Sequence, residues 1–231
     1  MLPFTVCPVG DTGLLVSFEQ RIAQSVGAAV AALKTRVAAA AIPGVVETVP
    51  AFASLLIFYD PLVTEYDAVA DAVQKLAQAP DSDTTAEEGR LVEIPVCYGG
   101  AFGPDLPFVA EHAGLTEKEV MELHAGREYR IYMLGFLPGF PYLGGLDERL
   151  FTPRLASPRT AIPAGSVGIG GEQTGVYPIA SPGGWQLIGR TPLKLFDPSA
   201  GRLPYAAGDR IRFCPITQDE FDAIAQKEGT V

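Results

Sequence analysis

The sequence has few of the residues that build disulfide frameworks and metal sites. Its 231 residues include three cysteines, Cys7, Cys97 and Cys214, and two histidines, His112 and His124. The cysteines are widely spaced and form no Cys-x-x-Cys pair, so neither a disulfide framework nor a thiolate metal site is indicated. The two isolated histidines offer no ligand pair for zinc. We therefore expect no bound metal and a reducing, cytoplasmic environment.

Positive charge and long apolar runs are also scarce. The formal net charge is -10, with 17 basic against 27 acidic residues, whereas a nucleic-acid surface needs a clustered basic footprint. Glycine, proline or a charged residue interrupts every long apolar stretch, and residues 1–5 do not form a basic segment followed by an apolar one. We therefore expect no nucleic-acid partner, no export and no membrane insertion.

The composition that remains is that of a globular protein, with 48% hydrophobic and 19% charged residues. Strand and helix patterns alternate over residues 1–80, beginning with a hairpin signal around Gly10–Gly13 and followed by apolar residues at helical spacing. This alternation predicts a small α+β domain over residues 1–80. The polar, acidic stretch 81–90 has no apolar anchor and predicts an interdomain linker.

Residues 91–231 are predicted to form a second, mainly-β domain. Thr116 and Glu119 have the spacing of a capping box, which predicts that a helix begins there. From Tyr129 onward the chain breaks into short strand patterns separated by glycine and proline, which indicates a barrel or sandwich. A short helix from Thr217 to about Gln226 is expected to end the domain.

The most informative feature is a dense mixture of glycine and proline with large aromatic residues. It extends from Gly135 to Asp147 and is echoed at Gly170–Pro178 and Ser181–Trp185. Linkers lack such aromatics and packed cores avoid backbone breakers, so the mixture indicates shaped loops on a rigid body. Loops of this kind commonly carry binding and chemistry. We therefore place the functional site between Tyr129 and Thr191.

These motifs resemble the 5-oxoprolinase B subunit family, also described as the KipI family or allophanate hydrolase subunit 1. The likeness spans nearly the whole chain and is carried by Tyr98–Gly100, Gly103–Leu106, Gly135–Leu143, Gln173–Gly175, Ser181–Trp185 and Gly189–Pro192. Ala101 departs from the family, which has an acidic residue there. The resemblance implies an α+β N-terminal domain followed by a mainly-β, cyclophilin-like barrel.

The resemblance also implies an activity. The chain is expected to be one component of an ATP-dependent 5-oxoprolinase, a hydrolase that opens 5-oxo-L-proline to L-glutamate, and to be inactive alone. Its implied partners are a homologous barrel subunit of the C type and a third protein of the A type. The alternative is a regulator that inhibits a sensor histidine kinase. An allophanate hydrolase or carboxyltransferase-type activity ranks third, because the chain has no biotin-carrier Met-Lys-Met segment.

Opening a lactam requires cations and hydrogen-bond donors aimed at developing negative charge, which makes Arg159, Arg190 and Gln173 candidate catalytic residues. A guanidinium can hold a carboxylate or phosphate through two parallel bonds. Each arginine can equally form a structural ion pair or carbonyl clamp, and Gln173 can simply close a barrel turn. His124 ends the predicted capped helix, where it can act as a general acid or base or can cap the helix.

The expected substrate-binding residues are mostly aromatic: Phe140, Tyr142, Thr174, Tyr177 and Trp185. Aromatic residues are also common in cores, but Trp185 lies in a Gly-Gly turn, where exposure or a subunit interface is expected. Gly168–Gly171 superficially resembles a phosphate-binding loop, yet it lacks the Gly-Lys-Ser or Gly-Lys-Thr ending and a following helix. ATP use is therefore assigned to the complex, and direct binding by this chain is left open.

Overall fold

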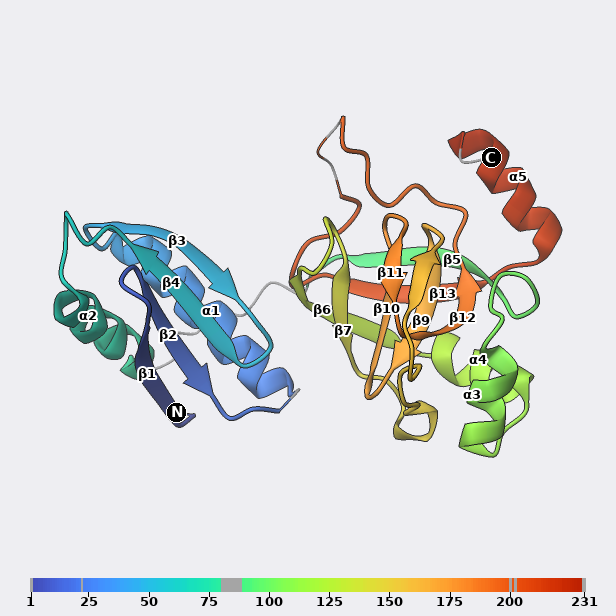
Figure 1. Ribbon diagram of the computed structural model, residues 1–231, viewed down its shortest axis with the longest axis horizontal. Coiled ribbons are helices and arrows are strands. Elements are labelled where there is room, and N and C mark those ends of the chain that lie inside the picture. Colours follow the sequence, from blue (N-terminus) through green and yellow to red (C-terminus); the bar gives the residue numbers. More distant parts are fainter. Residues whose placement is uncertain (1, 22, 80–88, 200, 202, 230–231) are drawn as a thin grey trace. The chain divides into compact units, whose positions relative to one another are not determined.

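A computed structural model describes residues 2–21, 23–79, 89–199, 201 and 203–229. The chain divides into two compact units, Met1–Glu87 and Glu88–Val231 (Figure 1). The predicted linker 81–90 lies mostly outside the described residues, so the boundaries at 80 and 91 stay predictions.

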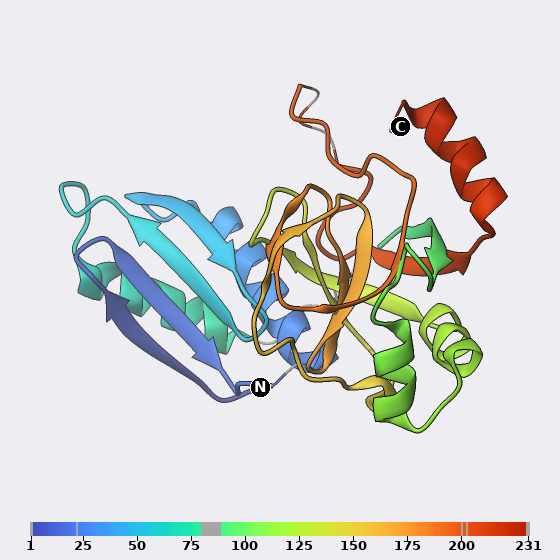
Figure 2. The ribbon, with the colours of Figure 1, turned by 45° about the vertical axis from the view of Figure 1, so that its right-hand side comes forward.

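The first unit is an antiparallel four-stranded sheet with the strand order β1-β2-β4-β3, covered by two helices. Its elements are β1 (Phe4–Val9), β2 (Gly13–Phe18), α1 (Gln24–Ala40), β3 (Val45–Pro50), β4 (Ser54–Tyr59) and α2 (Tyr66–Gln78). Alternate residues of β2 and β4, including Leu14, Val16 and Ile57, are buried in one core with apolar residues of both helices. The two helices therefore cover the same face of the sheet (Figure 2).

The second unit is built on a closed barrel with the strand order β10-β7-β6-β13-β5-β12-β9. The barrel strands are β5 (Leu91–Tyr98), β6 (Glu128–Leu134), β7 (Pro141–Gly144), β9 (Ser166–Gly170), β10 (Gln173–Val176), β12 (Gln186–Arg190) and β13 (Arg210–Pro215). A separate two-stranded sheet pairs β8 (Arg159–Ile162) with β11 (Ser181–Gly183). The expectation of a barrel is thus confirmed.

Short helices pack against this barrel. They are α3 (Leu106–Ala113), α4 (Glu117–Ala125), the 3-10 turn η1 (Glu148–Leu150) and α5 (Gln218–Glu228). The capping box predicted for Thr116 and Glu119 is confirmed, and Thr217 and Glu220 form a second one at α5. Among the described residues, none of the helices is both long enough and apolar enough to cross a membrane.

Candidate functional site

The predicted aromatic residues come together beside the barrel. The Phe140 ring lies 5.2 Å from that of Tyr142, 5.3 Å from that of Tyr177 and 5.5 Å from that of Trp185, each in a T-shaped arrangement. Phe140, Tyr177 and Trp185 are buried, while Tyr142 is partly exposed. The expectation that Trp185 is exposed is wrong, because its side chain is only 6% exposed.

The glycines of the motif loops are explained by this aromatic cluster. A Cβ atom at Gly170 would lie 2.5 Å from Cδ1 and Nε1 of Trp185. A Cβ atom at Gly175 would lie 3.0 Å from Phe140 Cζ, and one at Gly183 would lie 2.7 Å from the Tyr177 hydroxyl. Only residues without a side chain let the rings approach the backbone this closely. The glycine and aromatic positions of the sequence therefore form one packing arrangement.

Arg159 stands at the start of β8 and is held by an acidic partner. Its Nη2 donates to Oδ1 of Asp105 at 2.7 Å, and its Nη1 donates to the Trp185 carbonyl at 3.4 Å. The other carboxylate oxygen of Asp105 accepts from the Leu187 backbone N–H at 2.6 Å. Asp105 thereby ties Arg159 to the strand that follows Trp185. The motif Gly103–Leu106 contains Asp105, but only the structure reveals its partner.

Replacing Asp105 by asparagine is expected to lower the free energy of unfolding by about 2 kcal/mol, because the Arg159 guanidinium loses its charged partner. Denaturant unfolding followed by Trp185 fluorescence measures this change in the barrel. Asp222→Asn removes an equivalent charge from the exposed face of α5 and is the matched control. Equal stability of the two variants would contradict the ion pair's role.

Gln173 and Arg190 lie apart. Gln173 begins β10 opposite Gly170, while Arg190 ends β12 opposite Ser166. Gly170 and Ser166 are the two ends of β9, so about 13 Å of strand separates the two positions. Arg190 donates from Nε to the Ala164 carbonyl at 2.9 Å, so it holds a backbone carbonyl of its own domain, as the structural alternative for this residue predicts.

His124 lies inside the barrel unit and connects two hydroxyl groups. Its Nδ1 lies 2.8 Å from the Tyr98 hydroxyl, and its Nε2 lies 2.7 Å from Oγ1 of Thr174. Thr174 donates its single hydroxyl proton to the Gly168 carbonyl at 3.1 Å, so it accepts from His124 Nε2–H. The network therefore assigns the neutral imidazole with its proton on Nε2, accepting from Tyr98 at Nδ1.

The surroundings of His124 keep it neutral. Its side chain is fully buried, and the imidazole stacks on Phe213 with the ring centroids 4.8 Å apart. This burial lowers the pKa of His124 from 6.5 to about 3, because the charged form loses its hydration. The expectation that His124 caps α4 is wrong, since both ring nitrogens bond to other elements. Thr174, also fully buried, is committed to the same network.

Arg154, which the sequence reasoning did not single out, lies at the edge of the aromatic cluster. It is exposed, and its guanidinium carbon lies 5.8 Å from the centroid of the Trp185 ring. Burial raises the pKa of Tyr177 to about 12, and the nearby positive charges of Arg154 and Arg159 oppose this rise. The Arg154 guanidinium and the Tyr177 ring therefore both lie beside the Trp185 indole, while Arg159 reaches the backbone carbonyl of Trp185. The sequence carries no signal for Arg154, because this residue lies between the glycine- and aromatic-rich motifs and not within one of them.

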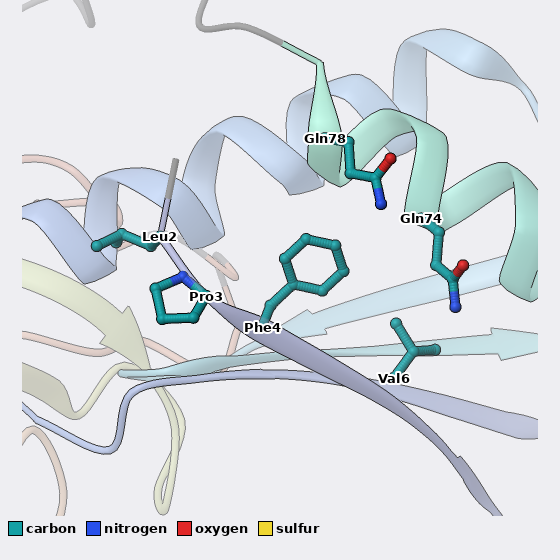
Figure 3. Close-up of a pocket in the computed structure, with 6 residues that line it drawn as sticks. All are labelled: Leu2, Pro3, Phe4, Val6, Gln74 and Gln78. Carbon is teal, nitrogen blue, oxygen red and sulfur yellow. The ribbon is translucent and has the colours of Figure 1, made fainter.

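The described residues form no metal centre at the predicted site, and a large open hollow lies in the other unit. Among the described residues, no group of three or more histidine, cysteine or acidic residues could hold a metal ion. An open hollow of about 760 Å³ lies in the first unit (Figure 3). It is lined by Leu2, Pro3, Phe4, Val6, Gln74 and Gln78. None of the predicted site residues lines this hollow.

Comparison with curated proteins identifies close relatives over most of the chain. The chain is 44% identical to the 5-oxoprolinase B subunit of Bacillus subtilis (strain 168) over 234 residues, covering 96% of each protein. It is 50% identical to the 5-oxoprolinase B subunit of Escherichia coli O157:H7 over 189 residues, covering 81% of each. These matches place both units and the motif loops within one family.

Solved structures agree with this relationship. A conserved uncharacterized protein, PH0987, from Pyrococcus horikoshii is 45% identical with a TM-score of 0.56, covering 94% of this chain and 100% of that one. The urea amidolyase of K. lactis has a TM-score of 0.80 at 21% identity, covering 97% of this chain and 15% of that one, and shows the fold alone. A family model described as "Carboxyltransferase domain, subdomain C and D" matches residues 4–205. The chain therefore belongs to the 5-oxoprolinase B subunit family.

Proposed function

We propose that the chain is the B subunit of an ATP-dependent 5-oxoprolinase that opens 5-oxo-L-proline to L-glutamate. The 44% identity to the Bacillus subtilis protein across 96% of both chains carries this proposal. Its partners would be a homologous barrel subunit of the C type and a third protein of the A type, and the complex would act in the cytoplasm. Within this proposal the chain contributes binding groups and is inactive alone.

The chemistry of ring opening guides the roles given to individual residues. A lactam is a poor electrophile, so its amide oxygen must be activated before water attacks the carbonyl carbon, and negative charge then develops on oxygen. Arg154 lies beside the Trp185 ring, Arg159 donates to the Trp185 carbonyl and Tyr142 packs on Phe140, so donor groups of the required kind gather at the aromatic cluster. We assign buried His124 and Thr174 to holding β10 in place, instead of to proton transfer with substrate.

The glycine-rich segment of this chain does not fit a phosphate-binding loop. Gly168 and Gly170 belong to β9, which pairs with β10 on one side and β12 on the other. Their backbone groups are therefore part of the barrel and do not form a phosphate cradle ahead of a helix. We propose that the assembled enzyme binds ATP through groups outside this segment.

Reconstitution tests the proposed function directly. Glutamate release from 5-oxoproline and ATP would be measured with this chain alone, with the candidate barrel partner, and with the third protein added. We expect turnover only in the complete mixture, at least about 100-fold above the mixture that lacks this chain, because positioned catalytic groups commonly contribute factors of this order. ATP consumption no faster with 5-oxoproline than without it would overturn the proposal.

A carboxyltransferase-type or allophanate-hydrolysing activity has weaker support. The family description includes the word carboxyltransferase, but the urea amidolyase similarity at 21% identity supports the fold alone. Inhibition of a sensor histidine kinase stays a prediction that no comparison tests. The relationship to the 5-oxoprolinase proteins, at 44% and 50% identity, favours the hydrolase.

A further inference from the structure

Arg154 has an exposed guanidinium that faces no acidic side chain among the described residues. Among the residues that the structure describes, it makes neither an ion pair nor a hydrogen bond, and its contact is with the face of Trp185 at 5.8 Å. The backbone leading to it is anchored, because Thr152, two residues earlier, pairs with Gly171 in an isolated β-bridge. An arginine that lies beside an aromatic ring and has no acidic partner there can bind an anion brought by a ligand.

The neighbouring arginine does not compete for this role. Arg159 already donates to Asp105 and to the Trp185 carbonyl, so its charge is largely compensated. Arg154 adds an uncompensated positive charge in a chain whose formal net charge is -10. A local positive charge on an acidic protein concentrates small anions at that point. The partly exposed Tyr142, whose ring lies against Phe140, adds an aromatic wall.

We propose that Arg154 binds the carboxylate of a small-molecule substrate at the edge of the Trp185–Tyr142 aromatic wall. The two parallel N–H donors of one guanidinium match the two oxygens of a carboxylate. A nucleoside triphosphate such as ATP instead requires several cations or a bound metal to balance its charge. The geometry around Arg154 is the basis for proposing that the ligand is a carboxylate. The further step, that this carboxylate belongs to 5-oxoproline, rests on the proposed function.

Trp185 makes the site directly observable, because it is the only tryptophan of the chain. The full-length protein would be titrated with 5-oxo-L-proline, its carboxamide, ATP and inorganic phosphate while Trp185 fluorescence is recorded. We expect saturable binding of 5-oxo-L-proline and none of the carboxamide. Loss of a charge-assisted pair weakens binding by roughly tenfold to a hundredfold, which is the loss expected for Arg154→Gln.

Two further variants separate binding from structure. Arg154→Lys keeps the charge but loses the fork of donors, so its affinity should fall between those of wild type and Arg154→Gln. Lys118→Gln removes one positive charge from the exposed face of α4 and should bind as wild type does. Unchanged thermal unfolding of both Arg154 variants would show that the barrel is intact, since Arg154 is exposed.

The outcomes distinguish this inference from the proposed function. Equal affinity in wild type and Arg154→Gln, or no saturable carboxylate binding, overturns the inference even when the reconstituted complex is active. Arg154-dependent binding of ATP or phosphate in preference to the carboxylate also overturns it. Arg154-dependent carboxylate binding without 5-oxoproline hydrolysis in any mixture supports the site and overturns the proposed function.

Discussion

His124→Phe is expected to lower the free energy of unfolding of the barrel unit by about 2–4 kcal/mol at pH 7. Phenylalanine retains an aromatic ring next to Phe213 but cannot accept from the Tyr98 hydroxyl or donate to Thr174. Leaving a buried hydroxyl without a partner costs its full desolvation penalty. The larger ring must also fit a site in which the imidazole is fully buried.

The same variant should change the pH dependence of stability. The pKa of His124 is lowered from 6.5 to about 3 by burial, so below pH 6.5 the unfolded chain binds a proton that the folded chain does not. Wild-type stability from this group is fully present above pH 6.5 and falls by about 1.4 kcal/mol per pH unit as the pH decreases toward 3. The difference between wild type and His124→Phe should therefore shrink by about 2 kcal/mol between pH 6.5 and pH 5.

Urea unfolding at pH 7.5, 6 and 5, followed by Trp185 fluorescence, measures both effects in the barrel. His112→Gln is the matched control, because it removes the other histidine of the chain from an exposed position. It should change stability at pH 7.5 by less than about 0.5 kcal/mol. A difference between wild type and His124→Phe that stays constant with pH would show that the native imidazole titrates normally.

Local patterns predicted the elements of this chain well. The spacing of Thr116 and Glu119 defined the start of α4, and the turn around Gly10–Gly13 lies between β1 and β2. Both signals depend on residues a few positions apart, whose geometry follows from backbone rules. The mixture of glycine with aromatic residues also located the Phe140 and Trp185 cluster.

The contacts that define the site join residues far apart in the sequence. His124 meets Tyr98 across 26 positions and Thr174 across 50, and Arg159 meets Asp105 across 54. The order in which the strands close the barrel decides which polar residues meet. No periodicity in the sequence predicts that order. Exposure of Trp185 was mispredicted for the same reason, since the flanking glycines suggested an open turn while distant strands cover the ring.

Gly170→Ala is expected to displace Trp185 and to lower the free energy of unfolding by about 1–3 kcal/mol. The new Cβ atom would lie within 2.7 Å of three Trp185 ring atoms, Cδ1, Nε1 and Cγ. Because the Trp185 side chain is buried against Phe140 and Tyr177, the ring cannot move without disturbing the cluster. Its fluorescence maximum should shift, and carboxylate binding at Arg154 should weaken with it.

Gly184→Ala gives a matched comparison one residue before the same tryptophan. The nearest atoms to a Cβ at Gly184 are the Leu155 carbonyl oxygen and Pro158 Cγ, both at 3.7 Å, which is ordinary contact. Stability should change by less than about 0.5 kcal/mol, and the fluorescence maximum should stay where it is in the wild type. If Gly170→Ala behaves in the same way, the glycine is not required by the indole. If only Gly170→Ala moves the indole and weakens binding, the motif glycines serve the site by letting the ring lie on the backbone.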